Sequence, residues 1–201
     1  MIGHVSRRLS KVSEGAGPVE STRRRLSKRQ ADTVARLADA AIEELRRVGY
    51  AGLTVRNVAA RGGVAAATAY TYFSSKNHLI TEVFWRKLRE LPDAPTVGIP
   101  VDRVVQVLRD VASLAVAEPA LAAACTAAML GDDPDVEHLC ERIGREWHRR
   151  LGAALGPAAD ADVLQALEIS LGGALLHAGL GYSSYERMAD LLESSARLIV
   201  R

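Results

Sequence analysis

Apolar side chains recur every three or four residues along most of this chain, which is the period of an amphipathic helix. The first such stretch begins at Lys28 and continues to Gly49, a glycine that can adopt the left-handed conformation that commonly ends a helix. Its apolar positions are Val34, Leu37, Ala38, Ala41, Ile42, Leu45 and Val48. No stretch alternates apolar and polar residues as a half-buried strand would, so the pattern predicts an all-α protein.

Three shorter helices are expected after the first one. Thr54 can cap a second helix over residues 55–61, Gly62-Gly63 interrupts the pattern, and a third helix is expected over residues 65–70. Ser75 can cap a fourth helix, which a pair of prolines ends. Two short helices around a glycine turn are typical of the helix-turn-helix, whose second helix enters the major groove of DNA.

The second half of the chain shows five further helical patterns, separated by prolines, glycines and serines. They lie near residues 101–117, 119–130, 134–155, 160–182 and 184–200. About nine helices are therefore expected in three parts. These parts are a flexible basic arm (1–26), a DNA-binding domain made of a three-helix helix-turn-helix unit and a fourth helix (27–91), and a second helical domain (92–201).

The formal net charge of +2 hides a strong asymmetry between the two halves. Residues 1–91 carry 17 Lys and Arg against 8 Asp and Glu, a net +9, whereas residues 92–201 carry 9 against 16, a net −7. Such a split points to a polyanionic partner for the first half. The alternative is that the charge of the first half reflects only a solvated basic face together with a disordered basic tail.

Other classes of protein find little support in the residues. The two cysteines, Cys125 and Cys140, lie in apolar helical patterns, which predicts reduced thiols and a cytoplasmic protein. No apolar run has the length of a membrane span, no glycine loop for a cofactor appears, and no carboxylate pairs with a nucleophile in a known catalytic motif. His138, Cys140 and His148 lack the spacing of a metal site. We therefore expect no enzyme, no cofactor, no metal and no membrane partner.

The segment from Gly52 to Val64 and the segment from Thr68 to Leu79 together resemble the DNA-binding signature of the TetR family of regulators. The Gly-Val turn, the Tyr-x-Tyr-Phe run and the Ser-Lys start of the fourth helix occur in the order typical of that family. The resemblance covers about residues 28–90 and implies an N-terminal helix-turn-helix domain joined to a C-terminal helical domain that binds a ligand and dimerises.

The resemblance also assigns residues to DNA contact. Tyr70 and Lys76 match positions that contact phosphates, with Tyr72 alongside, whereas Thr54 and Arg56 open the second helix beside the DNA backbone. Base reading is expected from Arg56, Thr68 and Thr71, because Ala66 and Ala67 offer only apolar contact, for example with thymine methyl groups. The alternative is that Tyr70, Tyr72 and Phe73 are simply core aromatics.

For the C-terminal domain, the resemblance implies a small-molecule pocket and a four-helix dimer bundle made by the last two helices. Small residues around Gly172 would permit close helix approach, and the expected interface residues are Gly172, Leu175, Leu192 and Ile199. The candidate pocket residues are Trp85, Met129, Trp147 and His177, the polar or polarisable members of apolar stripes.

The expected function is that of a homodimeric repressor, released from a palindromic operator by a small hydrophobic ligand. The alternative is a DNA-binding regulator with the same N-terminal half and no small-molecule effector.

Overall fold

The computed structural model describes residues 28–157 and 159–200, so the basic arm predicted for residues 1–26 lies outside the described residues. In the described part of the chain, all regular structure is helical, which confirms the all-α prediction. The helices are α2 (Lys28–Gly52), α3 (Val55–Arg61), α4 (Ala66–Tyr72), α5 (Lys76–Glu90), α6 (Pro100–Ala117), α7 (Pro119–Met129), α8 (Pro134–Leu155), α9 (Ala161–Gly179) and α10 (Tyr185–Ile199).

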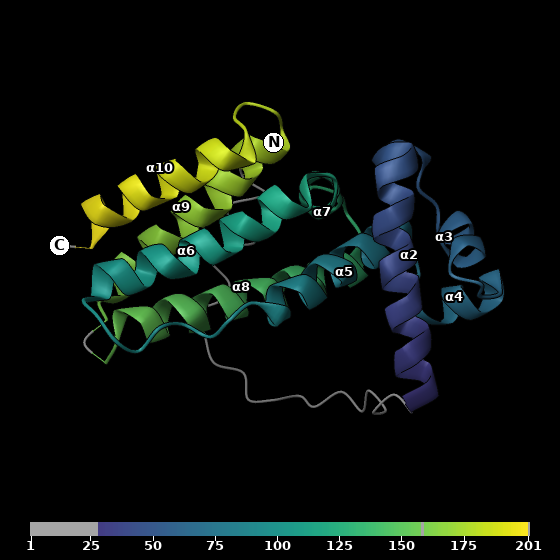
Figure 1. Cartoon of the computed structure of the whole chain (residues 1–201), viewed down its shortest axis with the longest axis horizontal. Coiled ribbons are helices and arrows are strands. Elements are labelled where there is room, and N and C mark those ends of the chain that lie inside the picture. Colours follow the sequence, from purple (N-terminus) through teal and green to yellow (C-terminus); the bar gives the residue numbers. More distant parts are fainter. Residues whose placement is uncertain (1–27, 158, 201) are drawn as a thin grey trace.

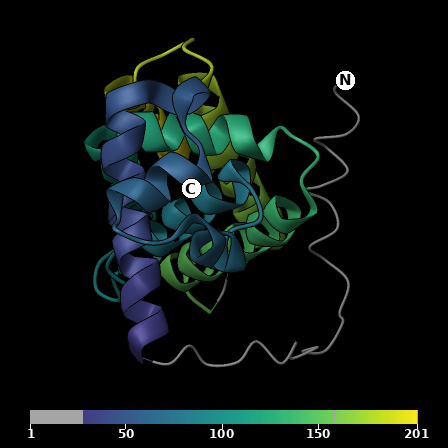
Figure 2. The same ribbon diagram turned by 90° about the vertical axis from the view of Figure 1, so that its right-hand side faces the viewer.

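The helices form two parts that share α5. In Figure 1, α2 stands between the short pair α3–α4 on one side and α5 on the other, and α6–α10 form a bundle beyond α5. Figure 2, turned to face the α3–α4 side, shows this pair in front of the bundle. The long helix α5 packs against α7 and α8 as well as against α2. The predicted domain border after residue 91 therefore assigns to the N-terminal domain a helix that also belongs to the bundle.

The predicted helix limits hold closely, with two differences near the N-terminal end. Gly49 has φ 67° and ψ 175°, a conformation that favours glycine but is not left-handed helical. The helix is therefore interrupted at Gly49 and continues for one more turn to Gly52, instead of ending at Gly49. The third helix runs over Ala66–Tyr72 rather than over residues 65–70, and its N-cap residue, Ala65, makes no side-chain capping bond.

Two helix ends in the bundle are held by arginines from other helices. Arg150 of α8 is buried, and its guanidinium donates hydrogen bonds to the backbone carbonyls of Leu88, Leu91 and Pro92 at the end of α5. Its Nε also donates to a carboxylate oxygen of Glu146 at 2.7 Å. In the same way, Arg103 of α6 donates to the carbonyl of Ala154 at 2.7 Å, at the end of α8. These cations satisfy carbonyls that a helix end leaves without intrahelical partners.

A buried carboxylate joins α2 to α3. Glu44 accepts hydrogen bonds from Arg47 Nη2 at 2.6 Å and from Arg61 Nε at 2.7 Å. Hydrogen bonds from these two guanidinium groups lower the pKa of Glu44 to about 2. A carboxyl group whose pKa is lower in the folded state stabilises the fold above its unfolded pKa, and this stabilisation is lost as the pH falls towards the folded pKa.

We expect Glu44→Gln to reduce the acid sensitivity of the fold. The wild-type free energy of unfolding, measured by urea titration, should fall between about pH 4.5 and pH 2, because Glu44 gains a proton over this range mainly in the unfolded chain. The variant should be less stable at pH 7 but lose less stability over this range. The matched control is Glu43→Gln at the exposed neighbouring carboxylate, which should keep the wild-type pH slope. An unchanged slope in Glu44→Gln would contradict the argument.

No single helix in the described residues is long and apolar enough to cross a membrane. The helices α6 and α7 meet that requirement only as a pair, and they meet at an angle of 102°. Cys125 and Cys140 form no disulfide, and burial raises the pKa of the Cys125 thiol.

Candidate nucleic-acid interface and ligand site

The turn between α3 and α4 brings these two short helices together. Gly63 has φ 62°, which favours glycine, and Val64 N donates to the carbonyl of Ala59 at 2.9 Å across the turn. Val58, Ala59 and Ala69 are buried between the helices and α2. The pair is thus held as a rigid unit whose outer side remains free for contact, as the helix-turn-helix prediction requires.

Thr54 and Arg56 stand at the start of α3, where the two side chains have different tasks. Thr54 Oγ1 accepts from Asn57 N at 3.1 Å while Asn57 Oδ1 accepts from Thr54 N at 2.8 Å, so Thr54 is the predicted N-cap within a capping box. Arg56 is exposed, and no hydrogen bond or ion pair to another described residue holds its guanidinium. Its donors remain available for a ligand such as a guanine edge or a phosphate.

On α4, most of the predicted DNA-contacting residues lie on the outer side. Ala67, Thr68 and Thr71 are exposed, Tyr70 is 49% exposed, and Ala66 is half-buried. Thr71 Oγ1 donates to the carbonyl of Ala67 at 3.1 Å, which leaves its oxygen free only as an acceptor. Tyr70 is too exposed to be a core aromatic, whereas Phe73 is buried as the alternative interpretation requires.

Tyr72 and Lys76 are less available than the resemblance implied. Tyr72 is half-buried, with its ring centroid 6.5 Å from that of Phe73. Lys76 Nζ donates to the carbonyl of Tyr50 at 3.0 Å and lies 4.3 Å from the centroid of the Tyr50 ring. The ammonium group already has these two partners, so a phosphate contact would have to compete with them.

A set of hydrogen bonds that sequence reasoning missed connects the turn after α4 to the turn before α8. Ser75 Oγ donates to Asp133 Oδ2 and Ser74 Oγ donates to Asp135 Oδ2, each at 2.5 Å. Ser75 caps α5 and Asp133 caps α8, so the N-caps of two helices are joined directly. We call these four residues the cap link. The Asp-Pro pair at residues 133 and 134 signals a helix start, but no local pattern reveals its partner across 58 residues of chain.

The structure does not bring the four predicted pocket residues together. His177 is exposed on the outer side of α9, with its ring 5.2 Å from that of Tyr182, so it cannot line an interior pocket of its own subunit. Met129 is half-buried, 3.7 Å from Cys125 between their sulfur atoms. Trp85 lines an open groove between α2, α5 and α8 instead of the interior of the bundle. Trp147 alone has a polar atom buried inside the bundle.

Two buried polar atoms of the bundle have no hydrogen-bond partner among the described residues. They are Trp147 Nε1 on α8 and the hydroxyl of Tyr185 at the start of α10. Burial raises the pKa of Tyr185 to about 12, so the hydroxyl stays protonated and can donate a hydrogen bond. An unsatisfied buried donor costs about 1–3 kcal/mol, which a bound molecule with an acceptor would recover.

The predicted interface residues face largely inward. Leu192 is 2% exposed and Leu175 is also buried, while Gly172 and Ile199 are half-buried, with an added Cβ on Gly172 lying 4.0 Å from the Trp147 ring. The exposed apolar side chains of these two helices are different ones, and the largest are Ile169, Leu191 and Leu198. Gly179 does permit close helix approach, but to Thr126 of α7 within the same chain.

Among the described residues, no group of three or more His, Cys, Asp or Glu side chains is placed to hold a metal ion. Of the three metal candidates considered, His148 instead contacts Glu168, with Nδ1 at 2.8 Å from a carboxylate oxygen.

The model of the family described as bacterial regulatory proteins, tetR family, matches residues 37–83, which span α3 and α4. An uncharacterised HTH-type transcriptional regulator of Mycobacterium tuberculosis is 48% identical over 177 residues, covering 87% of this chain and 83% of the relative. The HTH-type transcriptional repressor KstR of Rhodococcus jostii is 27% identical over 123 residues, covering 60% of this chain and 58% of the relative.

Among solved structures, a TetR transcriptional regulator from Rhodococcus sp. RHA1 has a similar fold, with a TM-score of 0.72 at 24% identity. The match covers 87% of this chain and 98% of that one, so the fold likeness extends through the C-terminal bundle.

Proposed function

This chain belongs to the TetR family of bacterial transcriptional regulators, and we propose that it is a homodimeric repressor released from a palindromic operator by a small hydrophobic ligand. The observation that carries the proposal is the exposed outer side of α3 and α4, where Arg56 has no partner among the described residues. The direction of control is supported by the similarity to KstR, which is named as a repressor. The relatives are named as regulators, so the proposal includes no enzymatic activity, and chromosomal DNA as the target implies a cytoplasmic protein.

The DNA contact follows from the chemistry of these exposed side chains. A short helix fits the major groove, where a bidentate arginine–guanine pair is worth about 1–3 kcal/mol of discrimination. Arg56 and Thr68 supply the hydrogen-bonding groups, and Ala67 supplies an apolar contact. Tyr70 and the exposed basic residues of α2 are suited to phosphates, which set position rather than sequence.

We expect Arg56→Ala to weaken operator binding by roughly tenfold to a hundredfold, because the variant loses one charge-assisted contact per half-site. The measurement is a footprint of the purified protein on the region upstream of its own gene, followed by a titration of the protected DNA at several salt concentrations. The wild type should protect a palindromic site and bind more weakly as salt rises.

The matched control is Arg145→Ala on α8, an exposed arginine in the bundle, which should keep wild-type affinity. If no site were protected even at low salt, the proposed function would fail. Equal losses in both variants would show that Arg56 acts only through net charge.

Dimerisation is proposed through the exposed sides of α9 and α10. Ile169, Gly173, His177 and Leu180 follow one another at helical spacing on the outer side of α9, and Leu191 and Leu198 do so on α10. The helices α9 and α10 pack against each other at one edge of the bundle (Figure 1), so we propose that these exposed side chains form one largely apolar surface. A second copy that covers this surface would generate the twofold symmetry that a palindromic operator needs.

The ligand is proposed to bind within the bundle beside Tyr185 and Trp147, whose buried donors have no described partner. Tyr185 belongs to the hydrophobic core and Trp147 packs against it, so the site favours a hydrophobic molecule with one or two hydrogen-bond acceptors. The cap link offers a physical route from this domain to α4, since Asp133 and Asp135 move with α8 and their partners directly follow α4. Tyr185→Phe should raise the stability of the ligand-free protein, because it removes an unsatisfied buried hydroxyl, and the alternative of a regulator without an effector predicts that it changes nothing else.

A further inference from the structure

A histidine lies directly against the cap link. His78 is in the first turn of α5, and its side chain is 14% exposed. Its Nδ1 atom lies 3.1 Å from Ser74 Oγ and 3.8 Å from Asp135 Oδ2, and its ring packs edge-on against Phe73 with the centroids 5.8 Å apart. Imidazole is the side chain that ordinarily changes charge between about pH 5 and pH 8. The contact can therefore depend on pH in a way that serines and aspartates alone cannot provide.

The start of α5 is built like the start of α3, with one difference. At α3, Thr54 Oγ1 accepts from Asn57 N, and Asn57 Oδ1 accepts from Thr54 N in return. At α5, Ser75 Oγ accepts from His78 N at 2.9 Å, and the acceptor that reaches back is His78 Nδ1, which accepts from Ser74 N at 3.3 Å. An amide oxygen accepts a hydrogen bond at any pH, whereas Nδ1 accepts one only while it carries no proton. The bond to the Ser74 amide therefore depends on the charge of His78.

The Nδ1 atom of His78 faces a donor on one side and acceptors on the other. The donor is the Ser74 amide. Ser74 Oγ donates its only proton to Asp135 Oδ2 at 2.5 Å, so both of these oxygens face Nδ1 with lone pairs. A neutral ring whose proton is on Nε2 satisfies the amide and leaves the oxygens opposed. An imidazolium loses the amide but donates to Ser74 Oγ, which begins a chain of donors that ends at the Asp135 carboxylate.

The charged groups that face His78 from α8 are two carboxylates. Besides Asp135, they include Asp133, whose Oδ1 accepts from Asp135 N at 3.1 Å and whose Oδ2 accepts from Ser75 Oγ at 2.5 Å. These donors are neutral, so the hydrogen bonds leave both negative charges in place. A positive charge on His78 would offset one of them.

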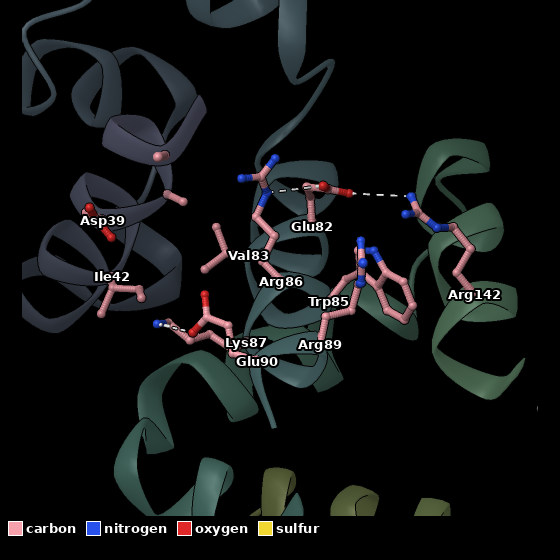
Figure 3. Close-up of a pocket in the computed structure, with 12 residues that line it drawn as sticks. Asp39, Ile42, Glu82, Val83, Trp85, Arg86, Lys87, Arg89, Glu90 and Arg142 are labelled. Carbon is pink, nitrogen blue, oxygen red and sulfur yellow. Dashed lines mark hydrogen bonds and ion pairs between the residues drawn. The ribbon is translucent and has the colours of Figure 1, made fainter. Parts of the chain in front are cut away.

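The other charged groups near the start of α5 are directed elsewhere. Lys76 Nζ donates to the carbonyl of Tyr50 on α2. Glu82, one turn further along α5, is paired with Arg142 of α8 at 3.8 Å (Figure 3). The helices α4 and α7 contain no charged side chain. The ionic partner of a protonated His78 is therefore the carboxylate of Asp135 on α8.

We propose that His78 makes the connection between α8 and the turn after α4 depend on pH. Near pH 8 the neutral ring holds the Ser74 amide, which is a contact within the turn itself. As the pH falls to about 5.5, the imidazolium releases this amide and donates towards Ser74 Oγ and Asp135, so the turn is held more firmly to α8. Because the turn directly follows α4 and α8 belongs to the bundle, acid strengthens the attachment of the α3–α4 unit to the bundle.

The consequence for DNA binding rests on the proposed function. Asp133 and Asp135 contact the turn that precedes Lys76, so their charges oppose a DNA phosphate near this turn while His78 is neutral. Protonation of His78 offsets one of these charges. Between about pH 8 and pH 5.5, operator affinity should rise about threefold more in the wild type than in His78→Asn, as expected for one partly exposed charge pair.

The test that needs no DNA is nuclear magnetic resonance on the full-length, 15N-labelled protein. As the pH falls, the Ser74 amide proton should move upfield because it loses its acceptor. Amide exchange in the first turn of α8, corrected for intrinsic rates, should slow about threefold because Asp135 is held more firmly. A histidine with a purely structural role would not give an amide that loses its bond beside a helix turn that becomes more protected.

Three variants separate the contributions. In His78→Asn, the amide oxygen can stand where Nδ1 stands and accepts at every pH, so neither response should occur. Asp135→Asn should keep the shift of the Ser74 amide and lose the slower exchange. The matched control is His138→Asn, an exposed histidine of α8 that lies 4.0 Å from Glu141, and it should respond as the wild type does.

The proposal is overturned if the ring nitrogen resonances show that Nδ1 of His78 keeps its proton at pH 8, if His78→Asn retains both responses, or if His138→Asn abolishes them. None of these readouts involves DNA, so a failure of operator binding would leave them intact. An equal pH dependence of operator affinity in the wild type and in His78→Asn would overturn the consequence for DNA binding alone.

Discussion

An Ile169→Glu/Leu198→Glu double variant should be monomeric and should lose at least about a hundredfold in operator affinity. The two side chains are 57% and 69% exposed in the subunit, so charges at these positions leave its core intact but place like charges in a twofold interface. The loss in affinity is large because each head of a dimer raises the local concentration of the other at its half-site, an effect worth about 10²–10⁴. Size-exclusion chromatography with light scattering and an operator titration measure the two effects.

The matched control for the double variant is Val97→Glu, which adds a charge at an apolar side chain that is 88% exposed in the segment between α5 and α6. It should remain dimeric and bind normally. Leu192→Glu provides the contrast, because this residue is 2% exposed and the charge should unfold the subunit rather than separate two folded ones. A double variant that still forms dimers would place the interface elsewhere.

Arg150→Ala should cost about 3 kcal/mol of folding free energy, the largest effect we expect from a single side chain outside the apolar core. The variant leaves the carbonyls of Leu88, Leu91 and Pro92 without their cationic donor and leaves Glu146 with one arginine fewer. Urea unfolding followed by circular dichroism, at fixed protein concentration, gives the free energy. Thermal unfolding should shift down by roughly 6–12 °C.

Arg149→Ala is the control for that loss, since this neighbouring arginine also contacts Glu146 but has a side chain 51% exposed. Its removal should cost less than about 1 kcal/mol, as is usual for a solvent-exposed ion pair. Similar costs at both positions would mean that Arg150 contributes only charge and that capping of α5 adds nothing.

The limits of most helices could be predicted because they depend on neighbouring residues. Thr54 and Ser75 cap the helices that follow them, as their positions before apolar stripes indicate. Pro100, Pro119 and Pro134 each stand in the first turn of a helix, where their missing N–H costs nothing. The turn between α3 and α4 could be predicted for the same reason, because its positive φ at residue 63 favours glycine and a glycine stands there in the sequence.

The interface could not be predicted in the same way, since α9 is apolar or small nearly all round. Ile169 and Leu171 are alike in type, yet one is exposed and the other is fully buried. Periodicity selects one side of a helix only when the other side is polar. The prediction of Leu175 and Leu192 rests on residue type alone, and the structure places both in the core of their own subunit.

Contacts between segments far apart in the chain also could not be predicted from the sequence. Lys76 matches a phosphate-contacting position by resemblance, but its ammonium group donates a hydrogen bond to the backbone carbonyl of Tyr50, 26 residues earlier. Trp85 is predicted to line an interior pocket because it belongs to an apolar stripe. In the structure it lines an open groove together with residues of α2 and α8. In each case the residue that determines the surroundings lies on another helix, and no pattern of neighbouring residues predicts that contact.

The sharing of α5 affects how the chain can be divided. Its N-cap residue, Ser75, is hydrogen-bonded to the N-cap of α8 in the cap link, and its last carbonyls accept hydrogen bonds from Arg150, so both of its ends are held by α8. A fragment that stops at residue 91 would keep the helix-turn-helix but expose the side of α5 that α7 and α8 cover. Because this side is apolar, the fragment would tend to aggregate and would be a poor substitute for the full chain in DNA-binding measurements. The described helices therefore fold as one unit, and the part that reads DNA is defined by its surface rather than by a boundary in sequence.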